Sequence, residues 1–294
     1  MSIALSSVAA FAAAVAGART VDAAAYTLRD GVVRSALVTA ARGGASVRVR
    51  LERDPLDDAA GTLHRANAES VALLSAAGAD AALTGPGETV LHIKAAVVDG
   101  VAWLADRNWA ADGPATVVCD SDPADVAAVT AALDGSASAG GQLRTTKRGA
   151  QFLEVDLLRG AGSAPVLIES ESFGSGAIYA ALLARARQGW PTRLLVAGRE
   201  AGQPGPAGDS ERRRLARLAA LGAEVRTGDP QGLDFDEKLA VTSAGAWVGS
   251  ANATYARGAA GEQRDWGLST RLPALVDGLR AAFERNWRAA RPLP

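Results

Sequence analysis

Cysteine is nearly absent from this chain of 294 residues, and the single copy, Cys119, excludes a disulfide within the chain. The absence of a disulfide fits a reducing compartment. Cys119 ends an apolar run at 115–119, so we expect a small buried side chain. Histidine is almost as scarce, with two copies, His64 and His92. We expect His64, which falls on a predicted helix among polar neighbours, to be solvated.

An excess of charge and long hydrophobic runs are also missing. The 31 Lys and Arg residues are balanced by 32 Asp and Glu residues, so no broad basic field favours nucleic acid or an anionic membrane. The Ala-rich stretch 3–17 is too short to span a bilayer and no positively charged segment precedes it. The spacing of Ile3, Val8, Phe11 and Val15 predicts a core-facing helix there, with a signal peptide as the alternative. We therefore expect a cytoplasmic protein without a transmembrane segment.

Patterns typical of strands and of helices alternate along the chain, which favours an α/β sandwich. Strands are predicted at 20–28, 46–51, 80–83, 165–170, 192–196 and 224–226, and helices at 32–42, 63–77, 123–133, 177–188, 210–221 and 273–288. The segment 135–141 is rich in Gly, Ser and Ala and indicates a junction. We predict a first half at 1–134, a linker at 135–149 and a second half at 150–294.

The stretch 91–109 predicts a strand, a tight turn at Asp99-Gly100 and a second strand. His92 and Lys94 are two residues apart at the start of this hairpin, so their side chains share one face. An ammonium group beside an imidazole suits a phosphate site. The cation holds the anion, while a ring nitrogen attacks phosphorus or transfers a proton.

A second copy of this hairpin follows downstream. The offset 236 − 92 = 144 relates three pairs without a gap: His92 to Asp236, Lys94 to Lys238, and Asn108 to Asn252. A nearly equal offset, 171 − 26 = 145, relates Tyr26 to Glu171. Because the correspondence extends over most of the sequence, the chain is a duplicated unit.

The duplicated pattern, His-x-Lys, four residues, Asp, a hairpin and Gly-Ser-x-Asn, resembles that of the phospholipase D superfamily. The first copy matches at His92, Lys94, Asp99 and Asn108, with Ala105-Asp106 in place of Gly-Ser. The second copy matches at Lys238, Gly249, Ser250 and Asn252, but has Asp236 for the histidine and Ser243 for the aspartate. The resemblance implies two pseudo-twofold-related α/β/α sandwich halves with the site at their interface.

The resemblance also implies a function, phosphodiester hydrolysis or transphosphatidylation through a phosphohistidine on His92. The phosphate oxygens would be held by the two lysines and by polar residues of each copy: Lys94, Lys238, Asn108, Asn252 and Ser250. No metal or cofactor is expected, because fixed cations already oppose the developing negative charge. We expect a phosphodiester substrate, a phospholipid rather than nucleic acid, and a monomer, because one chain supplies both halves.

Four carboxylates extend this prediction. Asp265, in the segment 264–268, resembles the acidic residue that in the family orients the histidine of the opposite half, here His92. Asp236, beside a lysine, should stay ionised, and its role as a catalytic group or as a salt-bridged remnant stays open. Glu169 and Glu171 follow a strand at the edge where α/β sheets bind ligands, so either is an auxiliary acid or a surface or capping residue.

Two alternatives to a phospholipase D-type phosphodiesterase stay open. Loss of the second histidine and of the first Gly-Ser is compatible with a non-catalytic module that binds phosphate or a phospholipid headgroup. A nuclease is the other alternative, although the balanced charge argues against it. Trp103 and Trp247, which the repeat relates, are expected to pack in the core where the halves join, or else to line the pocket.

Overall fold

The computed structural model describes residues 3–56, 58–109, 116–228, 235, 237–255 and 263–293. By its internal contacts the chain divides into two compact units. Unit 1 comprises Met1–Lys147 and the short segment Glu262–Trp266, and unit 2 comprises Arg148–Gly261 and Gly267–Pro294. The domain boundaries expected at 134 and 150 stay predictions, and Asp236 lies outside the described residues.

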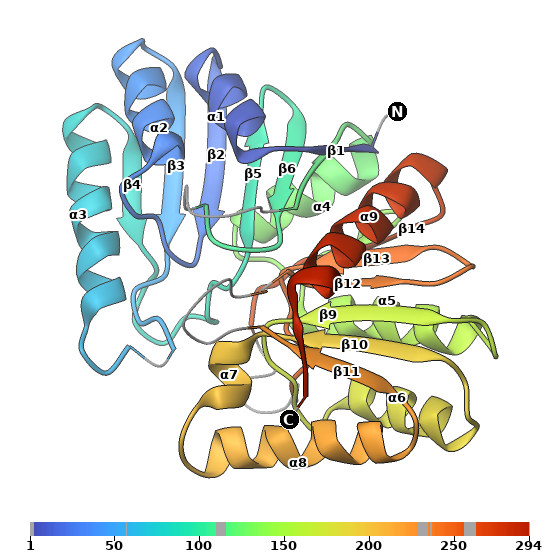
Figure 1. Ribbon diagram of the computed structural model, residues 1–294. Coiled ribbons are helices and arrows are strands. Elements are labelled where there is room, and N and C mark those ends of the chain that lie inside the picture. The colour runs from blue at the N-terminus through green and yellow to red at the C-terminus, as the bar shows by residue number, and fades with distance from the viewer. Residues whose placement is uncertain are drawn as a thin grey trace. The chain divides into compact units, whose positions relative to one another are not determined.

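Unit 1 is built on a seven-stranded mixed sheet in the order β1-β7-β6-β5-β2-β3-β4 (Figure 1). Its strands are β1 (Ile3–Ser6), β2 (Thr20–Ala25), β3 (Ser46–Leu51), β4 (Asp80–Leu83), β5 (Lys94–Val98), β6 (Val101–Ala105) and β7 (Val117–Asp120). Strands β2, β3 and β4 are parallel, whereas β5 runs antiparallel to β2 and pairs Lys94 with Ala25. The carboxyl ends of the parallel strands therefore meet the start of β5 at one edge of the sheet.

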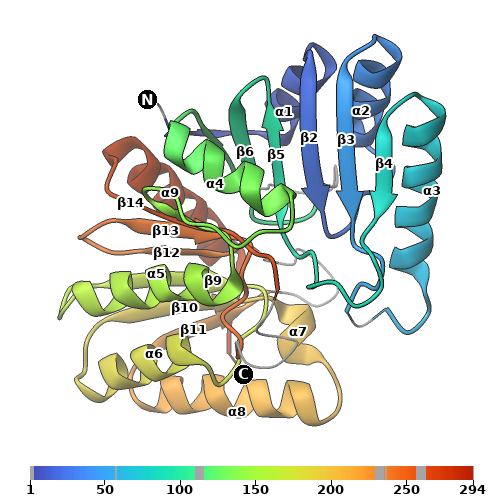
Figure 2. The same cartoon turned by 180° about the vertical axis from the view of Figure 1, so that it is seen from behind.

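Helices cover both faces of this sheet, as Figures 1 and 2 show. They are α1 (Val8–Ala16), α2 (Val32–Arg42), α3 (Thr62–Ala76) and α4 (Pro123–Leu133). Along β3 the buried residues Val47, Val49 and Leu51 share one apolar core with α1 and α2. Arg48 points to the opposite face, where it pairs with Asp134 at the end of α4. This alternation is the expected period of a strand covered on both sides.

In unit 2 the strands β15-β11-β10-β9-β12-β13-β14 form a sheet in that order. They are β9 (Val166–Ser170), β10 (Thr192–Val196), β11 (Glu224–Thr227), β12 (Leu239–Val241), β13 (Ala246–Gly249), β14 (Gly267–Thr270) and β15 (Arg291–Pro292), whereas the two-residue strand β8 (Leu143–Arg144) falls within unit 1. The helices are α5 (Lys147–Gly160), α6 (Ala177–Arg187), α7 (Gly198–Gly202), α8 (Pro206–Ala220) and α9 (Pro273–Ala289).

The strand orders of the two units correspond. The run β7-β6-β5-β2-β3-β4 of unit 1 matches β14-β13-β12-β9-β10-β11 of unit 2, with β5–β6 and β12–β13 as the two hairpins. The strand next to the hairpin, β2 in unit 1 and β9 in unit 2, runs antiparallel to the adjacent hairpin strand. It runs parallel to its other neighbour, β3 or β10. The predicted duplication of an α/β fold is confirmed.

Several local expectations were wrong. Residues 3–17 are not one helix, because Ile3–Ser6 pairs with β7 and the Ser7 side chain then caps α1, accepting from the backbone N–H of Ala10 at 3.1 Å. Phe11 and Val15 do face the core, as expected. His64 is half-buried and its Nδ1 lies 2.6 Å from the carbonyl oxygen of Arg53, and Cys119 is likewise only half-buried.

The repeat-related tryptophans each contribute to their own unit. Trp103 lies against Phe11, with ring centroids 5.5 Å apart, beside the core of unit 1. Trp247 is 1% exposed and belongs to the core of unit 2. Both packing roles agree with their size and apolar surface. Among the described helices, none combines the length and the apolar character that crossing a membrane requires.

Helix α5 carries one carboxyl group into the interior of unit 2. Glu154 is 1% exposed, between the core residues Ala150 and Leu158 one turn away on either side. Its Oε2 has no hydrogen-bond partner within the described part of the chain. Burial raises the pKa of this carboxyl to about 8, because an apolar surrounding disfavours the charged form.

Candidate active sites of the two halves

The hairpin β5–β6 positions the first half-site. Its turn places Asp99 at a φ of 46° and Gly100 at 83°, a conformation that favours Asp-Gly. The Asp99 carboxylate accepts hydrogen bonds from the backbone N–H groups of Thr20 and Arg19, which lower its pKa. Asp99 therefore anchors the hairpin to the start of β2, at the end of β5 remote from Lys94. The aspartate of the motif, Asp99, thus holds the hairpin in place through its hydrogen bonds to Arg19 and Thr20.

The other end of the hairpin brings His92 against Asp265. His92 Nδ1 lies 2.7 Å from Asp265 Oδ1, and the aspartate side chain is fully buried while that of His92 is 13% exposed. The neighbours of Asp265 fix its place, since Arg264 N donates to Val90 O at 2.8 Å and Trp266 Nε1 donates to Ala105 O at 2.9 Å. A carboxylate can only accept, so Nδ1 carries the proton and Nε2 keeps its lone pair.

Lys94 lies on the Nε2 side of the ring. Its Nζ is 3.2 Å from His92 Nε2 and donates to the carbonyl oxygen of His92 at 2.7 Å. The ammonium also lies 5.2 Å from the ring centroid of Tyr26, whose edge contacts His92 at a centroid distance of 4.8 Å. Lys94 is 2% exposed. A buried cation thus lies beside the ring nitrogen that is not held by Asp265.

A second buried lysine was missed by the sequence interpretation. Lys147 is 4% exposed, and its Nζ donates to Gln263 Oε1 at 3.2 Å, two residues before Asp265. Burial lowers the pKa of Lys147, and the charge of Asp265 acts in the opposite direction. No local motif signals this contact, because Lys147 lies in the predicted linker, far from the hairpin in sequence.

The second half-site contains a different set of contacts. The Glu171 carboxylate lies 3.1 Å from Lys238 Nζ, accepts from Asn252 Nδ2 at 3.1 Å, and accepts from Arg199 Nη2 at 2.9 Å. Lys238 is 2% exposed, so this pair is largely shielded from water. Glu171 thus contacts the two residues that the motif assigns to phosphate binding. Arg199 was not singled out in the sequence.

Glu169, the other proposed auxiliary acid, has different contacts. Both of its carboxylate oxygens accept from Asn286 Nδ2, at 3.0 and 3.2 Å, and the same amide donates to Glu237 at 3.1 Å. Glu169 and Glu237 are each 1% exposed. This buried network joins β9 to α9 and to the segment just before β12, whereas Glu171 lies at the lysine. A catalytic role for either glutamate stays a prediction.

The remaining phosphate-binding candidates lie where each second hairpin strand ends. Ser250 is fully buried directly after β13, and Asn252 follows it. Asn108 is half-buried three residues after β6. The Oδ1 atoms of Asn108 and Asn252 are buried and have no hydrogen-bond partner in the described part of the chain. Their convergence on one pocket with His92 stays a prediction.

Comparison with known proteins shows which solved structures share this fold. No family model matches the sequence, and no curated protein matches it. Phosphatidylserine synthase from Haemophilus influenzae Rd KW20 superposes with a TM-score of 0.70 at 10% identity, over 99% of this chain and 87% of that one. Polyphosphate kinase from Porphyromonas gingivalis superposes at 0.65 and 14% identity, over 96% of this chain and 45% of that one.

The chain has the duplicated phospholipase D fold. The resemblance inferred from the repeated motif is thus confirmed at the level of the fold. The chain spans 45% of the length of that polyphosphate kinase, and at these identities the superpositions carry no residue roles. Within this fold, unit 1, which includes Asp265, presents a histidine between a carboxylate and a lysine. The second half presents a lysine paired with a glutamate.

Proposed function

We propose that the chain is a phospholipase D-type phosphodiesterase in which His92 is the nucleophile. The contact that supports this most directly is the 2.7 Å hydrogen bond between Asp265 and His92 Nδ1, which leaves Nε2 as the attacking atom. The neighbouring Lys94 ammonium is suited to a non-bridging phosphate oxygen. A catalytic histidine needs this orientation, with one nitrogen fixed and the other directed at the substrate.

The first step forms a bond between Nε2 and phosphorus and breaks the bond from phosphorus to the leaving oxygen. The imidazole becomes positively charged, and the Asp265 carboxylate stabilises that charge. In the second step water or an alcohol attacks phosphorus, the Nε2–phosphorus bond breaks and its electron pair returns to Nε2, and the acceptor releases its proton to the solvent. Lys238, Asn108, Asn252 and Ser250 complete the proposed phosphate clamp.

The leaving oxygen also needs a proton unless it is weakly basic. Asp236 takes the position of the second histidine by the repeat, and its structure is not described. Glu171 faces two cations, which favour the charged carboxylate and make it a poor proton donor. An aryl oxide leaves without protonation, so an aryl phosphodiester is the substrate that tests the nucleophile alone.

The experiment compares turnover of an aryl phosphodiester and of phospholipid vesicles by the wild type, His92→Asn and His64→Asn. His92→Asn should abolish turnover of both substrates. His64→Asn is the matched control, because the chain has only these two histidines and His64 bonds to the carbonyl of Arg53. Unchanged turnover in His92→Asn would reject the assignment.

A non-catalytic phosphate-binding module is the second candidate. It is favoured by the Glu171 carboxylate, which already contacts Lys238 and Asn252. This function predicts saturable binding of inorganic phosphate or a headgroup analogue, weakened by Lys238→Ala, with no turnover of either substrate. Turnover by the wild type that disappears in His92→Asn rejects the second candidate.

A further inference from the structure

Unit 1 contains a cavity of about 240 Å³ on the face of the sheet that α4 covers. Three arginines line it, Arg48 and Arg50 on β3 and Arg264. Glu88 and Asp134 are the acidic residues of the lining. His92 and Lys94 do not line it, which separates this cavity from the first half-site.

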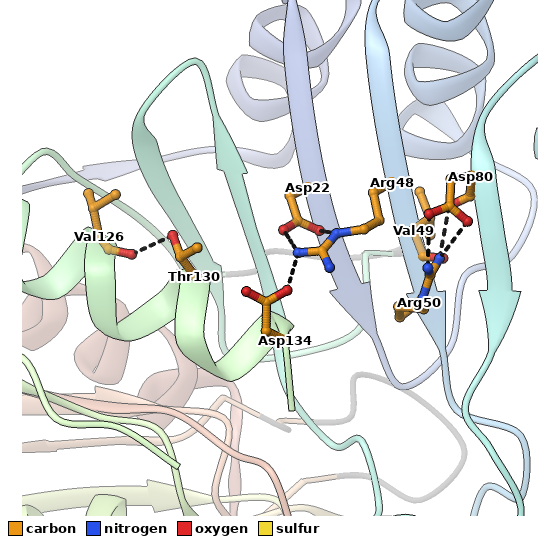
Figure 3. Close-up of polar contacts among 8 residues, drawn as sticks. All are labelled: Asp22, Arg48, Val49, Arg50, Asp80, Val126, Thr130 and Asp134. Carbon is orange, nitrogen blue, oxygen red and sulfur yellow. Dashed lines mark hydrogen bonds and ion pairs between the residues drawn. The ribbon is translucent and has the colours of Figure 1, made fainter. Parts of the chain in front are cut away.

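Two of the arginines are held by carboxylates (Figure 3). Arg48 lies between Asp22 and Asp134, and these carboxylates raise its pKa above the usual value. Arg50 donates to both carboxylate oxygens of Asp80, at 3.1 and 2.9 Å. These ion pairs hold the guanidinium groups of Arg48 and Arg50 in place on one face of β3.

The third arginine is held differently. Arg264 is paired through Nη2 with Glu88 Oε2 at 3.1 Å, where the Arg264 side chain is 11% exposed and the Glu88 side chain is 52% exposed. Its Nε is buried and has no hydrogen-bond partner among the residues described. A shielded guanidinium N–H without an acceptor is unfavourable, whereas an ion pair with an exposed glutamate is weak. The arginine therefore has one unfilled donor and one replaceable acceptor.

We propose that this cavity binds a small organic oxyanion, a phosphomonoester or a carboxylate, whose anionic group displaces Glu88 from Arg264. A guanidinium fork offers two parallel donors to either group, Nε–H and one Nη–H. The volume exceeds that of a bare ion, since one water occupies roughly 30 Å³, and Leu83 and Leu133 supply apolar wall for a carbon skeleton. The site is distinct from the proposed phosphodiesterase site, and its occupant contacts the residue that precedes Asp265.

The test is an NMR titration of the Arg264 Nε–H and Gly135 backbone N–H resonances with inorganic phosphate and with acetate. It uses Lys94→Ala protein, so that binding at the first half-site is removed. Each anion should shift both resonances until the site is saturated. The anion with the lower Kd shows whether the site prefers a phosphate or a carboxylate group. Arg264→Gln should weaken binding by about 10- to 100-fold, since it removes a charge-assisted fork.

Glu88→Gln gives the sharper outcome. The proposal predicts about two- to fivefold tighter binding, because the competing carboxylate is gone. Glu69→Gln is the matched control, an exposed glutamate on α3 that does not line the cavity, and should leave affinity unchanged. If Glu88→Gln leaves affinity unchanged, weakens it, or matches Glu69→Gln, the displacement model is wrong. If neither anion shifts the two resonances in folded protein, the site does not exist.

Discussion

Lys94 and Lys238 are related by the duplication and are equally buried, at 2% exposure each, yet their neighbours differ in charge. Lys94 lies beside His92 and 5.2 Å from the ring centroid of Tyr26. Lys238 lies 3.1 Å from the carboxylate of Glu171, the residue that the repeat aligns with Tyr26. The first lysine faces an imidazole and an aromatic ring, and the second faces an anion.

The comparison teaches that one duplicated scaffold places two buried lysines in different electrostatic surroundings through few changes. The strand pairing that positions each lysine is the same, β5 against β2 and β12 against β9. Replacing Tyr26 by its counterpart Glu171 places a negative charge where a substrate oxygen would contact the lysine. We infer that the first half supplies the nucleophile and that the second half is a weaker anion subsite.

Asp265→Asn should cause the largest change. An amide at this position can donate to Nδ1 and favour the tautomer with a protonated Nε2, which cannot attack. Turnover of an aryl phosphodiester should fall by about 10²- to 10⁴-fold with little change in KM. Asp120→Asn, a second buried aspartate of unit 1, is the control and should retain activity. Comparable activity in the two variants would remove the distinction between the halves.

The paired variants Lys94→Met and Lys238→Met test the comparison itself. Lys94→Met should lower kcat by about 10²- to 10³-fold, the usual effect of removing one fixed donor from a developing charge. Lys238→Met should cost about tenfold or less, because Glu171 already offsets the charge of Lys238. Steady-state kinetics at several salt concentrations measure both. Equal losses would show that the two lysines contribute alike.

Glu171→Gln and Tyr26→Phe should differ in their effect on competitive inhibition by inorganic phosphate. Removing the Glu171 charge should tighten competitive inhibition by inorganic phosphate about two- to tenfold, because Lys238, Asn252 and Arg199 lose a competing anion. Tyr26→Phe removes only the hydroxyl that donates to Leu56 O at 3.1 Å, and should cost about 1 kcal/mol of stability without changing inhibition. Weaker inhibition in Glu171→Gln would make Glu171 part of the phosphate site.

The pH dependence of unfolding should also separate the units. Glu154 in unit 2 has a pKa raised to about 8 by burial, and Asp120 in unit 1 has one raised to about 6, mainly by burial. Each carboxyl is protonated in the folded state at pH values where the unfolded chain has released the proton. Folding stability therefore decreases as pH rises above the unfolded pKa, at about 1.4 kcal/mol per pH unit for each group, and levels off above the folded pKa.

The loss between pH 6 and 8 should therefore come from unit 2. Denaturant unfolding from pH 5 to 9 measures it, and Glu154→Gln should flatten the curve above pH 6, since its amide does not ionise. Asp120→Asn should flatten only the part below about pH 6. An unchanged slope in Glu154→Gln would mean that the carboxyl is not held neutral in the fold.

Much of the fold could be predicted from periodicity. The helix at 32–42 and the strands at 46–51 and 80–83 match α2, β3 and β4. The helix ends at Gly43-Gly44, and the strand 46–51 shows a clear alternation of polar and apolar residues. Helix α5 was missed, since it begins within the polar segment taken as a linker. The strand β1 was hidden in an Ala-rich stretch, where its pairing with β7 overrides helix propensity.

The candidate site could be predicted only in part. The motif identifies His92 and Lys94, and the repeat aligns Tyr26 with Glu171. The ion pair between Glu171 and Lys238 could not be predicted, because it depends on β9 lying antiparallel to β12. The same holds for Lys147, whose place near Asp265 depends on a contact with Gln263 that spans 116 residues of sequence. Such long-range contacts leave no local pattern.

The most direct test of the central claim is the identity of the covalent intermediate. The protein is incubated with an aryl phosphodiester, quenched at alkaline pH, and examined by intact-mass and peptide mass spectrometry, with ³¹P NMR to assign the ring nitrogen. The account predicts one phosphoryl adduct, on His92 through Nε2, because Asp265 holds Nδ1 at 2.7 Å. Turnover with an adduct on His64, an adduct through Nδ1, or no adduct under burst conditions would contradict it.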